Sequence, residues 1–389
     1  MKRTKLSLGM TVLIVLIASS AFQIARDDLA AEEQSSEAGV PMFEVDPLWP
    51  KMEGNWIFGS IGGIAVDPTN DHVFVLNRPR SIARDEDFAT KEPPVAECCV
   101  PAKSVLEFDP AGNLIQEWGG PNPGAGYEWP ESEHGITIDH EGNVWIGGNG
   151  RKNTEQGTVG DAQFLKFTRA GEFLLQIGHQ GMSGGSQDTE NLGSAAKASV
   201  FPETNEVFIA DGYGNRRVIV FDADSGAYKR HWGAYGNKPD DEASLERLFE
   251  GPPPQQFNTV HSVLISNDGL VYVGDRANNR IQVFKPDGTF VKEGFIARKT
   301  LHGSGTTCDL AMSPDKEQKF LYATDPGNHH VWILNRDTLE VVGNFGRLGH
   351  QTGQFYHLHV LAVDTKGNIY TGESSGKRVQ KWLFKGFSS

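Results

Sequence analysis

Between residues 42 and 389, apolar and polar positions alternate in short runs with the period of two that is typical of β-strands. Turns rich in Gly, Asn and Asp separate these runs, and no helical periodicity lies between them. One unit recurs: an apolar run ending near Asp, a turn, an alternating strand, a second turn and another strand. Its six copies begin at Gly62, His134, Lys197, His261, Cys308 and His359. Such self-similarity indicates a repeat architecture.

Each copy continues into a third strand, as in RRVIVFDADSG and NRIQVFKPDG, and most continue into a fourth. The fourth strand often ends in an aromatic-glycine pair, such as Trp118-Gly119, Trp232-Gly233 and Phe345-Gly346. Four short strands in each of six units predict an all-β fold, a six-bladed β-propeller.

The two ends of the repeat region explain how the ring closes. The sixth copy ends after its third strand, at Phe387, whereas the segment MFEVDPLW (Met42 to Trp49) precedes the first copy and alternates like a strand. We predict that this segment supplies the missing outer strand of the last blade, which removes an open sheet edge. Residues 42–389 then form one propeller domain.

The first residues have the character of an export signal. Three basic residues precede the apolar run Leu6–Ala18, and small residues follow it, so residues 1–25 are predicted to be a signal peptide. The run is short for a spanning helix, so cleavage is favoured over retention as an anchor. Residues 26–41 are polar and acidic and read as a disordered leader. We therefore expect a secreted or periplasmic protein, with anchoring by an uncleaved N-terminal segment as the alternative.

The net charge limits the classes of binding partner, and the cysteine content limits the disulfides that can form. The chain has 36 basic and 50 acidic residues and a net charge of −14, which disfavours nucleic acid and anionic lipid. We expect no stable membrane insertion and a monomer. Three cysteines cannot form a disulfide framework. Cys98 and Cys99 are adjacent, closer than a disulfide normally allows, so a strained vicinal disulfide and two free thiols both stay open.

Three histidines share one repeat position. His134, His261 and His359 begin the innermost strands of blades 2, 4 and 6, which stand about 120° apart around a six-bladed axis. Three imidazoles converging from these directions would leave one coordination position for water or substrate, as in a catalytic metal site. Nitrogen ligands favour Zn²⁺, with Cu, Ni or Fe possible, over Ca²⁺. The alternative is that these are ordinary polar residues of the channel.

Four stretches carry a specific resemblance: EHGITIDHEGNVW, ADGYGNRRVIVF, VHSVLISNDGLVYVGDRANNRIQVF and LHVLAVDTKGNIY. They resemble NHL repeats and, within that class, the peptidyl-α-hydroxyglycine amidating lyases, as a distant bacterial-type relative. The resemblance implies a zinc-containing propeller that cleaves a peptidyl-α-hydroxyglycine into a peptide amide and glyoxylate. It also implies that the three histidines above are the zinc ligands and that the substrate is a peptide or small molecule.

The loop after the second strand of a blade should lie on the same face as the histidines. In three blades it holds a residue that resembles the active-site Tyr or Arg of that family: Arg78, Tyr213 and Arg276. Zinc and two guanidinium groups should pull the pKa of the tyrosine below its usual value of about 10, which makes it a candidate base. Arginine can bind a substrate carboxylate with two hydrogen bonds. Insertions at residues 79–103, 148–162 and 237–256 are expected to wall this mouth.

One departure from the family concerns calcium. The family binds a structural Ca²⁺ partly through an Asp directly after the third histidine, and here Val360 stands in that place, which puts a calcium site in doubt. Three functions remain: a zinc-dependent carbon–nitrogen lyase, a metal-dependent hydrolase or lactonase on the same scaffold, and a non-catalytic NHL binding module. Calcium lactonases line their channel with Asp, Asn and Glu, which this chain lacks at the repeat positions.

Overall fold

The computed structural model describes residues 39–154, 157–245 and 250–388. The predicted signal peptide and all but the last few residues of the predicted leader lie outside the described residues. Phe43–Phe384 form one compact unit. The blades described below belong to this unit, apart from the first residues of the outermost strand and the last residues of the third strand of blade 6.

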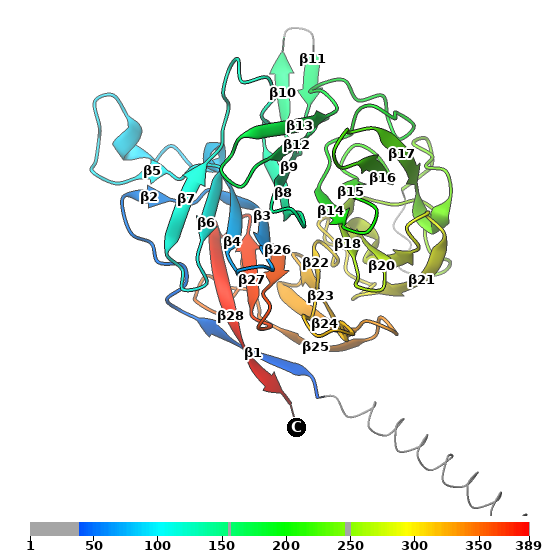
Figure 1. Ribbon diagram of the computed structural model, residues 1–389. Coiled ribbons are helices and arrows are strands. Elements are labelled where there is room, and N and C mark those ends of the chain that lie inside the picture. The colour runs from blue at the N-terminus through cyan, green and yellow to red at the C-terminus, as the bar shows by residue number, and fades with distance from the viewer. Residues whose placement is uncertain (1–38, 155–156, 246–249, 389) are drawn as a thin grey trace, which may run out of the picture. The chain divides into compact units, whose positions relative to one another are not determined.

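Six four-stranded sheets surround a central axis (Figure 1). This arrangement confirms the predicted six-bladed β-propeller. Blade 1 contains β3 (Ser60–Val66), β4 (Val73–Arg78), β6 (Val105–Phe108) and β7 (Leu114–Trp118). Blade 2 contains β8 (Glu133–Ile138), β9 (Val144–Gly148), β12 (Phe164–Phe167) and β13 (Phe173–Ile177). Blade 3 contains β14 (Lys197–Phe201), β15 (Glu206–Asp211), β16 (Arg217–Asp222) and β17 (Tyr228–Trp232).

The second half of the ring repeats this order from the axis outward. Blade 4 contains β18 (Val260–Ile265), β19 (Val271–Asp275), β20 (Arg280–Phe284) and β21 (Phe290–Phe295). Blade 5 contains β22 (Leu310–Met312), β23 (Phe320–Asp325), β24 (His330–Asn335) and β25 (Val341–Phe345). Blade 6 contains β26 (Leu358–Val363), β27 (Ile369–Glu373), β28 (Arg378–Phe387) and β1 (Pro41–Asp46).

The ring closes as the sequence predicts, because β1 is the hydrogen-bonded neighbour of β28 in blade 6. The strand ends at Asp46, earlier than the predicted segment does. Trp49 instead packs into the core, with its ring centroid 4.8 Å from that of Tyr370 in blade 6 and 5.8 Å from that of Phe108 in blade 1. The N-terminal segment therefore joins the last blade to the first through a strand and a buried side chain.

The hydrophobic core lies between neighbouring blades. One cluster joins blade 1 to blade 2, with Phe74 and Leu76 packed against Ile136 and Ile146. Comparable clusters fill the junctions between blades 2 and 3, 3 and 4, 4 and 5, and 6 and 1. Burial of apolar area at these five junctions holds the blades around the axis, and so determines what their innermost strands present to the channel.

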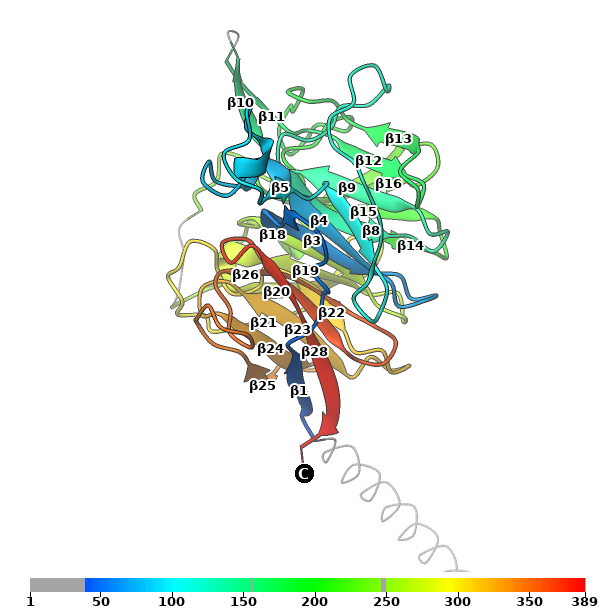
Figure 2. The same ribbon diagram turned by 90° about the vertical axis from the view of Figure 1, so that its left-hand side faces the viewer.

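Two elements extend from the blades (Figure 2). The blade 1 insertion contains the 3-10 helices η1 (Pro79–Ser81) and η2 (Phe88–Thr90), and its β5 (Val100–Pro101) pairs in parallel with β2 (Trp56–Ile57). The structure joins Cys98 to Cys99 in a disulfide within this insertion. In blade 2, β10 (Arg151–Thr154) and β11 (Gly157–Gly160) form a projecting hairpin.

Two further 3-10 turns, η3 (Ala234–Gly236) and η4 (Arg276–Asn278), complete the helical segments of the described chain. No helix within the described residues could cross a bilayer.

Candidate active site

Each of the three histidines is the second residue of an innermost strand and lies at a β-bulge. In β18 and β26 the histidine itself is the extra residue, and in β8 the extra residue is Gly135, directly after His134. A bulge bends the strand and redirects its side chains. The three imidazoles are therefore turned from the sheets toward the axis.

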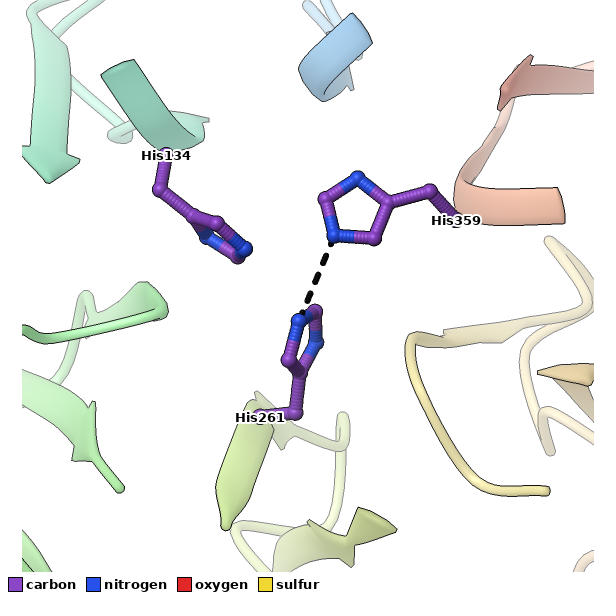
Figure 3. Close-up of side chains that lie close together, drawn as sticks. All are labelled: His134, His261 and His359. Atoms are coloured by element: carbon purple, nitrogen blue, oxygen red, sulfur yellow. Dashed lines mark hydrogen bonds between the residues drawn. The ribbon is translucent and has the colours of Figure 1, made fainter. Parts of the chain in front are cut away.

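The imidazoles converge from three blades (Figure 3). Their ring centroids lie 4.8 Å apart for His134 and His261, 4.9 Å for His134 and His359, and 5.1 Å for His261 and His359. One nitrogen atom from each ring lies within 4.8 Å of the other two. The structure thus brings the predicted histidine trio together in a group that could hold a metal ion.

Backbone carbonyl oxygens of blades 1, 3 and 5 determine which nitrogen of each imidazole carries the proton. The hydrogen-bond acceptors of Nδ1 are Ala196 O for His134 at 2.7 Å, Cys308 O for His261 at 2.7 Å, and Ile61 O for His359 at 2.9 Å. Because Nδ1 must donate in each bond, the Nε2 atoms carry lone pairs. Burial, the largest cause, holds the pKa of all three well below the usual value, so the rings are neutral. Neutral imidazoles with a carbonyl on the second nitrogen are the form that binds zinc.

The distance between the Nε2 atoms of two histidines shows whether they could bind one zinc ion together. His261 Nε2 lies 3.3 Å from His359 Nε2. Two nitrogens bound to one tetrahedral zinc at about 2.0–2.1 Å would lie roughly 3.3 Å apart. Two lone pairs that face each other at this distance repel unless a cation lies between them. The donor set therefore fits a zinc ion.

Tyr213 contacts this group from the loop that follows β15. Its Oη lies 3.0 Å from Nε2 of His134 and 3.0 Å from Nε2 of His261. A phenol has one proton to donate, so it can satisfy only one of these lone pairs. Arg276, the first residue of η4, donates from Nη1 to Tyr213 Oη at 3.2 Å and lies over the tyrosine ring at 5.2 Å. Two predicted site residues therefore contact each other and the histidines.

Arg78, the third predicted residue, lies at the end of β4. Its Nε donates to the carbonyl oxygen of Glu133 at 2.6 Å, one residue before His134. This bond places Arg78 beside the strand that carries His134, and its charge contributes to lowering the pKa of His134 and His359. Neither Arg78 nor Arg276 pairs with a carboxylate among the described residues. In that part of the chain the buried Nε of Arg276 also has no hydrogen-bond partner. Neither guanidinium group is therefore paired directly with a carboxylate of the described chain.

The electrostatics of Tyr213 differ from the sequence expectation. Burial raises the pKa of its hydroxyl, and this outweighs the opposing charges of Arg276 and Arg78. The two arginines alone therefore do not lower the pKa, and any lowering depends on the charge of a metal ion.

Sequence reasoning missed Cys308 as a neighbour of the site. Its Sγ lies 3.4 Å from Nδ1 and 3.6 Å from Nε2 of His261, so the sulfur packs on the ring. Burial raises the pKa of this thiol to about 12, so it stays protonated. Its repeat position was a signal, because Cys308 stands in blade 5 where blades 2, 4 and 6 carry histidine.

His357 is a second neighbour, two residues before His359. Its Nδ1 lies 2.6 Å from Ser374 Oγ and its Nε2 lies 3.1 Å from Ser304 Oγ. Burial, and then the charges of His302 and Arg276, lower its pKa to about 4. His357 is thus a neutral, hydrogen-bonded side chain close to Arg276.

Two of the three insertions are linked through Glu131, which lies just before β8. Its carboxylate lies 2.8 Å from Arg80 of the blade 1 insertion and 3.5 Å from Lys152 of the β10–β11 hairpin. Because Arg80 and Glu131 are close in sequence to Arg78 and His134, this contact lies near the site. The part of the third insertion at residues 246–249 lies outside the described residues.

Comparisons with known proteins identify an NHL repeat and several relatives of this chain. The model of the NHL repeat family matches residues 257–284. Peptidyl-glycine alpha-amidating monooxygenase A of Xenopus laevis is 28% identical over 352 residues, covering 87% of this chain and 33% of that protein. This chain therefore spans about a third of the length of that relative. A probable peptidyl-alpha-hydroxyglycine alpha-amidating lyase of Caenorhabditis elegans is 25% identical over 331 residues, covering 82% of this chain and 81% of that protein.

Among solved structures, a streptogramin B lyase superimposes with a TM-score of 0.53 at 11% identity, covering 90% of this chain and 100% of that one. This likeness shows the fold alone. The present protein is a six-bladed β-propeller with an NHL repeat, and its sequence relatives include the peptidyl-α-hydroxyglycine amidating lyases.

Proposed function

We propose that this protein is a zinc-dependent lyase that cleaves the carbon–nitrogen bond of an α-hydroxyglycine-like substrate, releasing an amide and glyoxylate. The observation that carries the proposal is the position of Tyr213 Oη, 3.0 Å from Nε2 of both His134 and His261 and within reach of Arg276. The tyrosine hydroxyl group, the candidate metal ligands and a guanidinium group thus lie within contact of one another. The names of the amidating-lyase relatives support this assignment.

The reaction requires one proton to move. The hydroxyl group loses its proton as its carbon–oxygen bond becomes a carbonyl, the carbon–nitrogen bond breaks, and the departing amide nitrogen takes up a proton. We assign this exchange to Tyr213 Oη, because a phenol can both accept and donate. Arg276, which donates to Oη at 3.2 Å, stabilises the phenolate form.

Arg78 and Arg276 are the groups we assign to the substrate carboxylate. Both lie beside the histidines, and a planar guanidinium can bind a carboxylate with two parallel hydrogen bonds. Zinc, when bound, supplies a Lewis acid for the hydroxyl oxygen of the substrate.

A direct assay tests the proposal. Purified protein loaded with zinc should release glyoxylate from α-hydroxyhippurate, and a zinc-free sample should not. A folded protein that holds one zinc per chain and yet releases no glyoxylate would exclude this function. Calcium in place of zinc would favour the hydrolase alternative. A protein that binds neither metal, and whose His134→Ala variant keeps its partner binding, would be a binding module.

A further inference from the structure

An ion pair crosses the channel beside His134 and His261. Lys197 Nζ lies 2.6 Å from Asp309 Oδ1, and both residues line the same cavity as His134 and His261. Lys197 begins β14 in blade 3, whereas Asp309 directly precedes β22 in blade 5. The side chain of Asp309 is 1% exposed and that of Lys197 is 15% exposed. The pair is therefore shielded from water and joins two blades that are not neighbours in the ring.

Both members of the pair adjoin a residue that orients a histidine. Lys197 directly follows Ala196, whose carbonyl oxygen accepts from His134 Nδ1 at 2.7 Å. Asp309 directly follows Cys308, whose carbonyl oxygen accepts from His261 Nδ1 at 2.7 Å. The ion pair thus links, across the axis, the two chain segments that supply these carbonyls, one directly before β14 and the other before β22.

The same carboxylate reaches the strand of the third histidine. Asp309 Oδ2 accepts from the backbone N–H of Leu361 at 3.1 Å, two residues after His359 in β26. A second path runs through Thr324, which accepts from Asp309 N at 2.8 Å and donates to His359 O at 3.1 Å. The ion pair therefore adjoins the residues that orient two of the imidazoles, and its carboxylate also contacts the strand that carries the third.

We propose that Lys197 and Asp309 are positioning residues whose ion pair holds the three imidazoles at the spacing required by one metal ion. This inference rests on the proposed metal site. A buried ion pair adds little to stability compared with well-packed apolar residues, although breaking it by removing one partner is costly. Groups that orient metal ligands typically alter metal affinity by 10–100-fold when removed. The role of this pair should therefore appear in metal affinity more than in folding.

The test compares zinc affinity with thermal stability in the full chain. Lys197→Met leaves Asp309 buried without its partner, whereas the double variant Lys197→Met/Asp309→Leu removes both charges. The dissociation constant for zinc is measured by competition with a chromogenic chelator, and the melting temperature is measured on metal-free protein. Lys166→Met is the matched control, because Lys166 is also a buried lysine, 3.7 Å from Asp139, but contacts none of the histidines.

We expect the single variant to melt at a lower temperature and to bind zinc roughly 10-fold or more weakly. The double variant should regain most of the melting temperature while its zinc affinity stays weak. Lys166→Met should lose melting temperature but not zinc affinity. Zinc affinity in the double variant equal to that of the wild type would overturn the inference and leave the proposed function intact. A wild-type protein that binds no zinc would overturn both.

Discussion

His261 donates from Nδ1 to the carbonyl oxygen of Cys308 at 2.7 Å, and this bond decides which ring nitrogen faces the axis. The opposite nitrogen, Nε2, lies 3.3 Å from Nε2 of His359 and 3.0 Å from Oη of Tyr213. A backbone carbonyl of blade 5 thus prepares a side chain of blade 4 to act as a ligand. The same relationship recurs between blades 2 and 3 and between blades 6 and 1.

Removing one ligand should abolish metal binding. We expect wild-type protein to carry about one zinc per chain and His261→Ala to carry less than roughly one tenth of that, because two imidazoles cannot complete a tetrahedral site. Elemental analysis of dialysed protein measures this. His330→Ala is the control, since His330 also bonds a backbone carbonyl, Gly346 O at 2.9 Å, but lies in blade 5 away from the trio. Equal zinc in wild type and His261→Ala would rule out the site.

Tyr213→Phe separates proton transfer from metal binding. The variant keeps the ring but loses Oη, so we expect the rate of glyoxylate release to fall by roughly 10²–10⁴-fold while the zinc content is unchanged. Tyr228→Phe is a suitable control, because it removes another tyrosine–histidine hydrogen bond, to His231 Nδ1 at 2.9 Å, on the surface. A Tyr213→Phe enzyme that turns over at the wild-type rate would remove the tyrosine from the mechanism.

The fold was accessible from the sequence because a repeat reveals itself by comparison with its own copies. The register of His134, His261 and His359 at one repeat position, together with closure of six blades, was enough to predict their convergence. The β-bulges that turn these side chains were not predictable, because an extra residue in one strand becomes evident only when its partner strand is paired.

Contacts between blades that are not neighbours could not be predicted from the sequence either. Lys197 occupies the histidine position of blade 3, which marks it as unusual, but its partner Asp309 lies 112 residues away. Nothing local relates these two positions, since their distance is set by closure of the whole ring.

The pKa of Tyr213 could not be predicted from the sequence for a different reason. Charges near a residue can be guessed from motifs, whereas the burial that outweighs them depends on the packed structure.

Arg276→Lys tests the assignment of the carboxylate site. A lysine keeps the charge but loses the planar pair of donors and the stacking on Tyr213, so we expect kcat/KM for α-hydroxyhippurate to fall roughly 10–100-fold, mainly through a higher KM. Arg230→Lys makes the same change at an arginine that lies 5.3 Å over the ring of Phe208 in blade 3. If both variants keep the wild-type KM, Arg276 does not bind the substrate.

Arg169 of blade 2 donates hydrogen bonds to Glu107 of blade 1. The stability that this contact contributes should depend on pH. Burial acts to raise the pKa of Glu107, but hydrogen bonds from Arg169, Gln116 and His72 outweigh it, and the pKa is lowered overall. A carboxyl group with a lowered folded pKa stabilises the protein above its unfolded pKa, and this contribution disappears as the pH falls through the folded value.

Arg169→Met should therefore lower the urea midpoint clearly at pH 7 and much less near about pH 3. Arg347→Met, at an exposed arginine, should change neither midpoint. A loss for Arg169→Met that is the same at both pH values would mean that the arginine acts through packing alone.

Closure of the ring can be tested at Phe43 in β1. Its ring lies 4.9 Å from Phe345 and 5.8 Å from Tyr322, both in blade 5, and 6.0 Å from Phe384 in blade 6. Because Phe43 is half-buried, Phe43→Ala should lower the free energy of unfolding by about 2 kcal/mol, less than a fully buried phenylalanine would. Urea unfolding measures this, with Leu48→Ala as control, since Leu48 is 79% exposed and should change the free energy by under about 0.5 kcal/mol. Equal effects of the two substitutions would mean that β1 adds nothing to the closed ring.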